Sequence, residues 1–313
     1  MLKTAFVFPG QGSQYVGMGE ELAKEYSVAA DVFKAADEAL GYKISDICFQ
    51  GPEEKLKQTV YTQPAILTTS YACYKVLEEK GLSPEVVAGH SLGEYTAIVA
   101  AGALQFEDAV RLVSKRGQYM EEAVPDGKGT MAAILGMDFE DVKKLCDDAS
   151  ENGVVELANL NCPGQVVIAG ETPAVEKAVQ LAPERGAKKA VLLKVSGPFH
   201  SSLMIPAAEK LADELDKISF KEPKIPVVAN YSGEMITTAQ GLKEGLKKQV
   251  NNSVLWDKSI RTLLDNGVEN FVEVGPGKVL SGLIKKINRK LNISNVEDVK
   301  SLHKLIEKMG EQK

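Results

Sequence analysis

Three features of the sequence predict an α/β fold. The first and last parts of the chain alternate short apolar runs, typical of buried strands, with longer stretches typical of helices. The middle part has shorter elements in the order βαββαβ, which is typical of a ferredoxin-like unit. Of the 313 residues, 44% are hydrophobic and 26% are charged, so the chain can bury a sizeable core. We therefore expect a mainly parallel sheet in the outer parts and a compact inserted unit in the middle.

The first part of the chain begins with a short buried strand that runs into a glycine-rich loop, in "TAFVFPGQGSQ". A helix is predicted in "YTQPAILTTSYACYKVLEEKG", with Thr62 as its N-cap and Pro64 in its first turn. A second strand, "EVVAGH", leads into the helix "SLGEYTAIVAAGA", and another helix follows in "FEDAVRLVSKRGQYMEEAV". That helix ends at a cluster of turn-forming residues, 125–129.

The middle part contains the strand "TMAAILG", the helix "DFEDVKKLCDDAS" and the strands "VVELANLN" and "QVVIAG". A helix with Thr172 as its N-cap, "TPAVEKAVQLAPERG", and the strand "AKKAVLLKV" complete it. The strands "IPVVAN" and "NFVEVG" then return to the character of the first part. We therefore predict one subdomain from residues 1–126 and 198–313, and a ferredoxin-like subdomain from residues 127–197.

Composition argues against several classes of function. The net charge is −6 and no basic stripe interleaves with aromatic residues, so we expect no nucleic-acid partner. The four cysteines lack zinc-ligand spacing, which predicts free thiols and no metal. No apolar run has membrane-spanning length and the N-terminal run is too short for a signal peptide, so we expect no membrane contact and a cytoplasmic location. "GQGSQY" and "GPGKVLS" fail the dinucleotide and P-loop patterns, so no cofactor is expected.

The stretch "GHSLGEY" places Ser91 between two glycines, after a predicted strand and before a predicted helix. This is the context of a nucleophile elbow, and it predicts an α/β-hydrolase-like core. The N–H of Leu92, at the helix N-terminus, is the natural first donor of an oxyanion hole. Gln11, in the loop "PGQGSQ", is the candidate for the second donor. The alternative is a chance G-x-S-x-G in a helix-capping turn.

The chain offers three histidines as a general base for Ser91. His303 lies in an amphipathic C-terminal stretch, and we expect it on the surface or in packing. His90 adjoins the serine, but successive side chains around an elbow diverge, so we expect it to shape the pocket. His200 follows a predicted strand on a Gly- and Pro-rich loop, and the order of Ser91 and His200 agrees with α/β-hydrolases. No Asp or Glu stands out as a third member, which predicts a dyad whose imidazole is held by a backbone carbonyl.

Arg116 is the single charged residue in the apolar arc of the helical wheel for residues 106–124. A buried guanidinium needs a partner, because desolvating it alone costs several kcal/mol. One interpretation is a structural ion pair with a buried carboxylate. The other is that Arg116 binds a carboxylate on the acyl group of the substrate, since its planar fork suits bidentate binding.

Seven motifs occur in order along the chain: "FVFPGQGSQ", "TQPAI", "VAGHSLGEY", "SKRGQYM", "GPFHSSLM", "QVNNSVLW" and "VEVGPGKVLSGL". Together they resemble the malonyl-CoA:acyl carrier protein transacylases of bacterial fatty acid synthesis. The resemblance covers essentially the whole chain. It implies an enzyme that carries the malonyl group on a serine before passing it to the phosphopantetheine thiol of the carrier protein.

The resemblance also implies roles for individual residues. Ser91 would carry the malonyl ester, His200 would act as base and then acid, and Arg116 would hold the malonyl carboxylate. The N–H groups of Gln11 and Leu92 would form the oxyanion hole, and the backbone carbonyl of Gln249 would orient the histidine. We count Arg116, Gln11, His90, Met120 and Phe199 as substrate-binding residues. Leu92 and Phe199 match the malonyl-type rather than the methylmalonyl-type pattern.

The expected partners are malonyl-CoA and an acidic acyl carrier protein. Lys188, Lys189 and Lys194 are candidates for carrier docking, against the alternative of an ordinary solvated strand. A monomer is expected. Three other functions remain open at this point: a thioesterase on the same dyad, a malonyltransferase that serves a polyketide synthase in trans, and a non-catalytic carrier-binding module.

Overall fold

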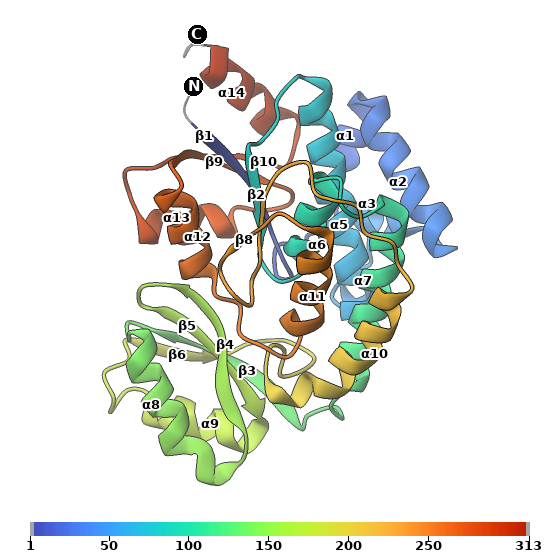
Figure 1. Ribbon diagram of the computed structural model, residues 1–313. Coiled ribbons are helices and arrows are strands. Elements are labelled where there is room, and N and C mark those ends of the chain that lie inside the picture. The colour runs from blue at the N-terminus through green and yellow to red at the C-terminus, as the bar shows by residue number, and fades with distance from the viewer. Residues whose placement is uncertain (1–2, 311–313) are drawn as a thin grey trace.

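The computed structural model describes residues 3–310 and forms two sheets from them (Figure 1). The larger sheet has six strands in the spatial order β10-β9-β1-β2-β7-β8. Its strands are β1 (Lys3–Phe8), β2 (Val86–Gly89), β7 (Val227–Val228), β8 (Met235–Ile236), β9 (Val268–Val274) and β10 (Asn292–Val296). All neighbouring strands are parallel except β7 and β8. The mainly parallel sheet predicted from the sequence is therefore present.

Helices cover both faces of this sheet because its central strands are apolar on both sides. In β1, Phe6 and Phe8 pack into one core cluster, whereas Ala5 and Val7 pack into another on the opposite face. This is the two-residue alternation of a strand. On the first face, α5 (Thr59–Glu79), α6 (Leu92–Ala100) and α14 (Val299–Gly310) contact the sheet. Seven more helices share the same core: α1 (Glu20–Glu25), α2 (Ser27–Leu40), α3 (Ile44–Gln50), α4 (Glu53–Leu56), α7 (Phe106–Glu122), α10 (Ile205–Asp216) and α11 (Ala239–Gln249). The second face is covered by α12 (Trp256–Asp265) and α13 (Val279–Ile287).

The second sheet is antiparallel and has the order β4-β5-β3-β6. Its elements are β3 (Gly129–Leu135), α8 (Phe139–Ala149), a 3-10 turn (Ser150–Asn152), β4 (Val155–Cys162), β5 (Gln165–Glu171), α9 (Thr172–Leu181) and β6 (Lys189–Leu192). In β3, Ala132 and Ile134 pack against α8 and α9, whereas Met131 and Ala133 join the core of the larger unit. One face of this sheet is thus covered by its own helices, and the other rests on the rest of the molecule (Figure 1).

The two units are also joined by backbone hydrogen bonds. The N–H of Leu160 in β4 donates to the carbonyl of Val254 at 2.9 Å, and the N–H of Val254 donates to the carbonyl of Ala158 at 2.9 Å. Val254 follows α11 in the larger unit. The segment between α11 and α12 therefore fixes the edge of the antiparallel sheet beside the larger unit.

The N-terminus of α5 differs from the prediction. The helix begins at Thr59 with Gln58 as its N-cap, so Thr62 and Pro64 lie inside it. The carboxylate of Glu121 in α7 accepts a hydrogen bond from the N–H of Thr59 at 2.7 Å. A carboxylate suits the positive end of a helix dipole. Because this cap comes from another helix, it could not be predicted from the residues around Thr59.

Smaller differences occur at other elements. Thr172 is the first residue of α9 rather than its N-cap, which is Glu171, and the Thr172 hydroxyl donates to the carbonyl of Gly127 at 2.8 Å. The last strand of the inserted unit is shorter than predicted, so Lys188 and Lys194 lie just outside β6. Four helices between residues 20 and 56, and the short strands β8 and β10, were not predicted.

Candidate active site

Ser91 lies in a sharp turn between β2 and α6, with φ 51° and ψ −107°. A positive φ is strained for a residue with a side chain, and such strain is typical of functional turns. The flanking glycines are required by close packing. A Cβ on Gly89 would lie 1.9 Å from the carbonyl carbon of Gly93, and a Cβ on Gly93 would lie 2.0 Å from the carbonyl oxygen of Phe8. The G-x-S-x-G pattern is therefore explained by the geometry of the turn.

Asn230 holds this turn in place. It lies two residues after β7, it is fully buried, and its Oδ1 accepts a hydrogen bond from the N–H of Ser91 at 2.7 Å. Its Nδ2 donates to the carbonyl of Gly89 at 2.6 Å. One amide thus satisfies a donor and an acceptor of the strained turn, which offsets part of its conformational cost.

His200 faces Ser91 across the site. The distance from Ser91 Oγ to His200 Nε2 is 2.7 Å. The other ring nitrogen, Nδ1, lies 2.9 Å from the carbonyl oxygen of Gln249 and 3.2 Å from that of Asn252. Since carbonyl oxygens only accept, Nδ1 carries the proton and Nε2 is free to accept one from the serine. The structure thus brings together Ser91, His200 and the backbone carbonyl of Gln249.

Burial controls the charge of His200. The side chain is only 4% exposed, and burial together with the nearby Arg116 guanidinium lowers the pKa of His200 to about 3. The two backbone carbonyls raise the pKa in the opposite direction but do not offset burial. The imidazole is therefore neutral at pH 7, which is the state required of a general base. His200 also has a positive φ of 61°, so both members of the pair lie on strained backbone.

Arg116 projects from α7 into the same site and is 1% exposed. Its Nη2 donates to Ser91 Oγ at 3.2 Å and to Gln249 Oε1 at 3.0 Å, and its Nη1 donates to Gln63 Oε1 at 2.8 Å. All three acceptors are uncharged. Within residues 3–310 no carboxylate forms an ion pair with this guanidinium, so the structural ion pair considered from the sequence is not found.

The glycine-rich loop after β1 lies against the serine turn. A Cβ on Gly10 would lie 2.4 Å from the carbonyl oxygen of His90, so only glycine fits there. The structure gives the backbone N–H of Gln11 and that of Leu92 no acceptor among the residues it describes. Leu92 is the first residue of α6, where free N–H groups are normal. The Gln11 side chain donates to Thr59 Oγ1 at 3.3 Å, which leaves its backbone N–H independent of the side chain.

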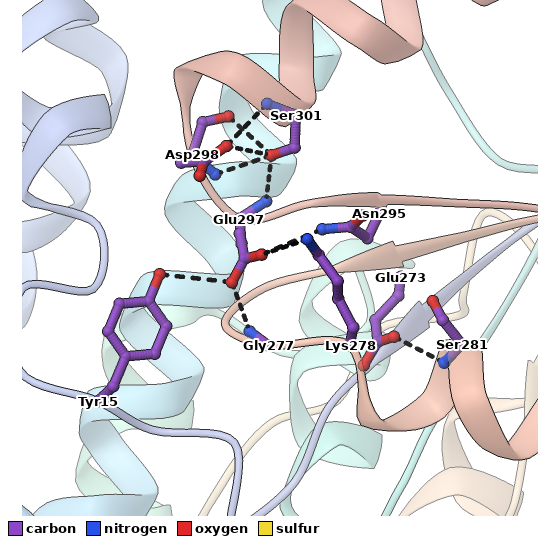
Figure 2. Close-up of polar contacts among 9 residues, drawn as sticks. All are labelled: Tyr15, Glu273, Gly277, Lys278, Ser281, Asn295, Glu297, Asp298 and Ser301. Carbon is purple, nitrogen blue, oxygen red and sulfur yellow. Dashed lines mark hydrogen bonds and ion pairs between the residues drawn. The ribbon is translucent and has the colours of Figure 1, made fainter.

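A cluster around Glu297 fastens the far end of this loop (Figure 2). Glu297 follows β10 and accepts hydrogen bonds from the Tyr15 hydroxyl at 3.4 Å and the N–H of Gly277 at 2.9 Å. Lys278 completes the cluster with an ion pair to Glu297 at 3.3 Å. Tyr15 lies in the loop that carries Gln11, between β1 and α1, and Gly277 lies in the turn after β9. The carboxylate therefore ties together the segments that leave three neighbouring strands.

The remaining predicted residues line or flank the site. His90 Nε2 lies 2.8 Å from Asn161 Oδ1 of β4, and its ring packs edge-on against Trp256. His90 thus bridges the two units. Burial lowers its pKa, which keeps it neutral. Met120, one turn beyond Arg116, accepts a hydrogen bond from Gln63 Nε2 at its sulfur, and Phe199 is buried directly before His200.

The other predicted positions lie on the surface. Lys188, Lys189 and Lys194 are exposed beside β6, and His303 is exposed on α14.

All four cysteines are buried free thiols. Among the described residues, no group of three or more His, Cys, Asp or Glu side chains could hold a metal ion, and no helix is long and apolar enough to cross a membrane.

Three residues of the site were missed by sequence reasoning. Gln63 and Asn230 are fully buried and contact Arg116 and Ser91. Glu94, in α6, is 1% exposed and accepts from Gln249 Nε2 at 2.7 Å. Two signals were available. Glu94 is the only charged residue in α6, and Asn230 lies two residues after the buried strand β7.

Comparison with known proteins identifies the family. A family model described as "Acyl transferase domain" matches residues 5–311. The malonyl CoA-acyl carrier protein transacylase of Bacillus subtilis is 51% identical over 313 residues, which cover 100% of this chain and 99% of that protein. The crystal structure of the transacylase of the same name from Clostridium perfringens is 46% identical with a TM-score of 0.96, covering 99% of this chain and 98% of that one.

A further solved structure is a complex of a type II PKS acyl carrier protein with its malonyl-transacylase. It is 44% identical with a TM-score of 0.95, covering 98% of this chain and 99% of that one. These similarities extend over the whole fold and include both sheets. The chain therefore belongs to the acyl transferase family and, within it, to the malonyl CoA-acyl carrier protein transacylases.

Proposed function

We propose that this acyltransferase moves the malonyl group from malonyl-CoA to the phosphopantetheine thiol of an acyl carrier protein, and so supplies fatty acid elongation. The reaction has two halves and passes through a malonyl ester of Ser91. The names of the relatives support the substrate and the acceptor. The arrangement of Ser91, His200 and Arg116 supports the chemistry.

In the first half, Ser91 Oγ attacks the thioester carbonyl while His200 Nε2 accepts the hydroxyl proton. The negative charge that develops on the carbonyl oxygen is stabilised by the N–H groups of Gln11 and Leu92. The carbon–sulfur bond then breaks, and the CoA sulfur leaves with the proton from His200. The carbonyl of Gln249 stabilises the transient imidazolium, in place of the carboxylate of a triad.

In the second half, the carrier thiol gives its proton to His200 and its sulfur attacks the ester carbon. The same N–H groups stabilise the oxyanion. The bond from the carbonyl carbon to Ser91 Oγ breaks, and His200 returns the proton to the serine. The enzyme is restored and the malonyl group leaves on the carrier, with no cofactor required.

The environment of Arg116 is the main support for a preference for malonyl over acetyl groups. Its guanidinium is buried, lies 3.2 Å from Ser91 Oγ and hydrogen-bonds only to uncharged oxygens among residues 3–310. A carboxylate on the acyl group supplies the charged partner that the protein itself withholds. Binding of this kind selects malonyl over acetyl, because an acetyl group leaves the guanidinium unpaired. His90, Met120 and Phe199 complete the walls around the acyl group.

Intact-protein mass measured after brief exposure to malonyl-CoA tests this function. We expect a malonyl adduct that persists in buffer, disappears when holo carrier protein is added, and is absent in Ser91→Ala. An adduct that decays in water alone would identify a thioesterase instead. An adduct with acetyl-CoA but none with malonyl-CoA would contradict the role of Arg116.

The finer description of the fold is also part of this proposal. We propose an α/β-hydrolase-like subdomain from residues 1–126 and 198–313 and a ferredoxin-like subdomain from 127–197. The strand order β4-β5-β3-β6, with helices α8 and α9 on one face, supports the second. The turn at Ser91 supports the first.

The carrier is expected to dock on β6 and its flanks. Exposed lysines at 188, 189 and 194 lie next to Val191 and Leu192, which are 37% and 44% exposed. This pairing of basic and apolar groups suits an acidic carrier. Charge reversal at these lysines should raise the KM for the carrier, and an unchanged KM would remove them from consideration. The enzyme is expected to act as a cytoplasmic monomer.

A further inference from the structure

The side-chain amide of Gln249 connects the buried carboxylate of Glu94 to the guanidinium of Arg116. Gln249 Nε2 donates to Glu94 Oε2 at 2.7 Å and to the carbonyl of Ser91 at 2.8 Å, while Gln249 Oε1 accepts from Arg116 at 3.0 Å. The N–H of Asn230 also donates to Glu94 Oε2, at 3.1 Å. Glu94 therefore anchors the two amides that hold the serine turn and the guanidinium.

Glu94 has no cation in direct contact. Among residues 3–310 it forms no ion pair, and both its donors are neutral N–H groups. Burial raises the pKa of Glu94 to about 7, against the opposing effects of Gln249, Asn230 and the charge of Arg116. The anion of Glu94 is favoured by the hydrogen bonds from Gln249 and Asn230 and, in addition, by the positive charge of Arg116, and this last contribution is lost when another carboxylate pairs with the guanidinium.

The other groups around Glu94 leave Arg116 as the charge that controls it. β1, β2 and β7 contribute no buried charged side chain, and Arg116 is the only buried charged residue of α7. The charged residues of α5 and α11 are partly or fully exposed to solvent. Tyr95, beside Glu94 on α6, is neutral because burial raises its pKa to about 12. The site therefore holds one buried positive charge and one buried group that can balance it.

We propose that Glu94 is a positioning residue that balances Arg116 in the free enzyme and takes up a proton from solvent when the acyl carboxylate pairs with Arg116. This inference rests on the proposed function. Without proton uptake, the loaded site would hold two buried carboxylates against one guanidinium. With it, the site stays neutral, and protonated Glu94 can still accept the hydrogen bonds of Gln249 and Asn230 through its carbonyl oxygen. Acetyl brings no charge and requires no proton.

The pH dependence of malonyl loading follows from this linkage. Below about pH 7 Glu94 is already protonated in the free enzyme, so malonyl binding requires no proton. Above that pH the proton must be taken from solvent, and the KM for malonyl-CoA rises by at most roughly tenfold per pH unit. The KM for acetyl-CoA should not show this rise. Both substrates carry the same CoA phosphates, so titration of these phosphates affects both KM values equally. Comparing the pH dependence of the two KM values therefore isolates the effect of the malonyl carboxylate.

Glu94→Gln tests the proposal because it keeps an acceptor oxygen for Gln249 and Asn230 but cannot titrate. Single-turnover acylation is measured from pH 6 to 9 with both substrates. We expect the KM for malonyl-CoA to rise with pH in the wild type, relative to that for acetyl-CoA, and not to rise in this variant. Glu273→Gln is the matched control, since Glu273 is also buried and accepts from the N–H of Leu280. It accepts from the N–H of Ser281 as well (Figure 2). This control should keep the wild-type rise. Equal pH slopes in wild type and Glu94→Gln would overturn the proposal.

Calorimetry gives a second test that needs no change at Glu94. Ser91→Ala is titrated with malonyl-CoA and with acetyl-CoA at pH 8, in two buffers of different ionisation enthalpy. We expect proton uptake with malonyl-CoA in excess of that with acetyl-CoA, and equal uptake would refute the coupling. A wild-type enzyme that forms no malonyl adduct would instead refute the proposed function, so the two failures can be told apart.

Discussion

Two arginines on different sides of the molecule have opposite surroundings. Arg261, in α12, is 53% exposed in its side chain and forms a two-pronged ion pair with Asp257 at 2.7 and 3.2 Å. Arg116, in α7, is buried and is surrounded by the uncharged oxygens of Gln63, Gln249 and Ser91. The exposed guanidinium of Arg261, which water can solvate, thus has a carboxylate partner. The buried guanidinium of Arg116, which water does not reach, forms no ion pair within residues 3–310.

This difference distinguishes a structural charge from a binding charge. An exposed ion pair contributes less than about 1 kcal/mol to stability. A buried cation without a carboxylate partner costs stability, and folded proteins retain such costs mainly at functional sites. The outer helix α12 and the inner helix α7 can therefore be compared by matched substitutions, which should change stability slightly in one and activity strongly in the other.

The largest contrast is expected between two histidines. His200→Ala removes the acceptor for the Ser91 proton and should lower the rate of malonyl loading by about 10⁴-fold. His303→Ala, on the exposed side of α14, should leave the rate within twofold. Rapid-quench measurement of acylation provides the comparison. Comparable losses in the two variants would remove His200 from the proposed mechanism.

The arginine pair should give the next largest contrast. Arg116→Ala removes the partner of the malonyl carboxylate and should lower kcat/KM for malonyl-CoA by about 10²–10³-fold, which corresponds to roughly 3–4 kcal/mol of lost binding. Loading of acetyl should persist. Arg261→Ala should change neither substrate by more than about twofold. An equal loss of malonyl and acetyl in Arg116→Ala would mean that the guanidinium supports the fold instead of the substrate.

The pH dependence of acetyl loading sharpens the contrast inside the site. The low pKa of His200, about 3, predicts that the rate stays constant from pH 7 down to pH 5, because protonation that disables the base begins only below that range. With an ordinary imidazole pKa near 6.5, the rate would fall about 25-fold over the same range. In Arg116→Ala the loss should begin at a higher pH, since removing the positive charge raises the pKa of His200. Identical profiles in both enzymes would contradict this electrostatic effect.

The smallest effect is expected at the Glu297 cluster. Glu297→Ala removes the acceptor of the Gly277 N–H and of Tyr15 and should lower the free energy of unfolding by about 1–2 kcal/mol. Lys278→Ala, which removes only the half-exposed ion pair, should have a weaker effect. Thermal unfolding of the two variants measures the difference. A larger loss in Lys278→Ala would show that the ion pair, rather than the backbone contact, holds the loop.

Sequence reasoning succeeded where the deciding contacts are local. The turn at Ser91 is encoded by its two glycines, and the burial of Arg116 follows from the spacing of apolar residues on one helix. It failed where the contacts cross the chain. Asn230 contacts a residue 139 positions away, and Glu94 contacts Gln249 across 155 positions. The start of α5 was misplaced for the same reason, because its capping carboxylate belongs to α7.

The position of β1 in the sheet affects how the chain can fold while it is being synthesised. β1 is synthesised long before β9, yet it lies in the interior of the sheet, with Lys3 beside Val268 in β9. One edge of β1 therefore stays open until most of the chain has been synthesised, and an open apolar strand invites association with other chains. Nascent chains that already contain Ser91, Arg116 and His200 still lack this closing strand. Assembly of the core around the catalytic pair therefore depends on β9, which is synthesised after all three of these residues.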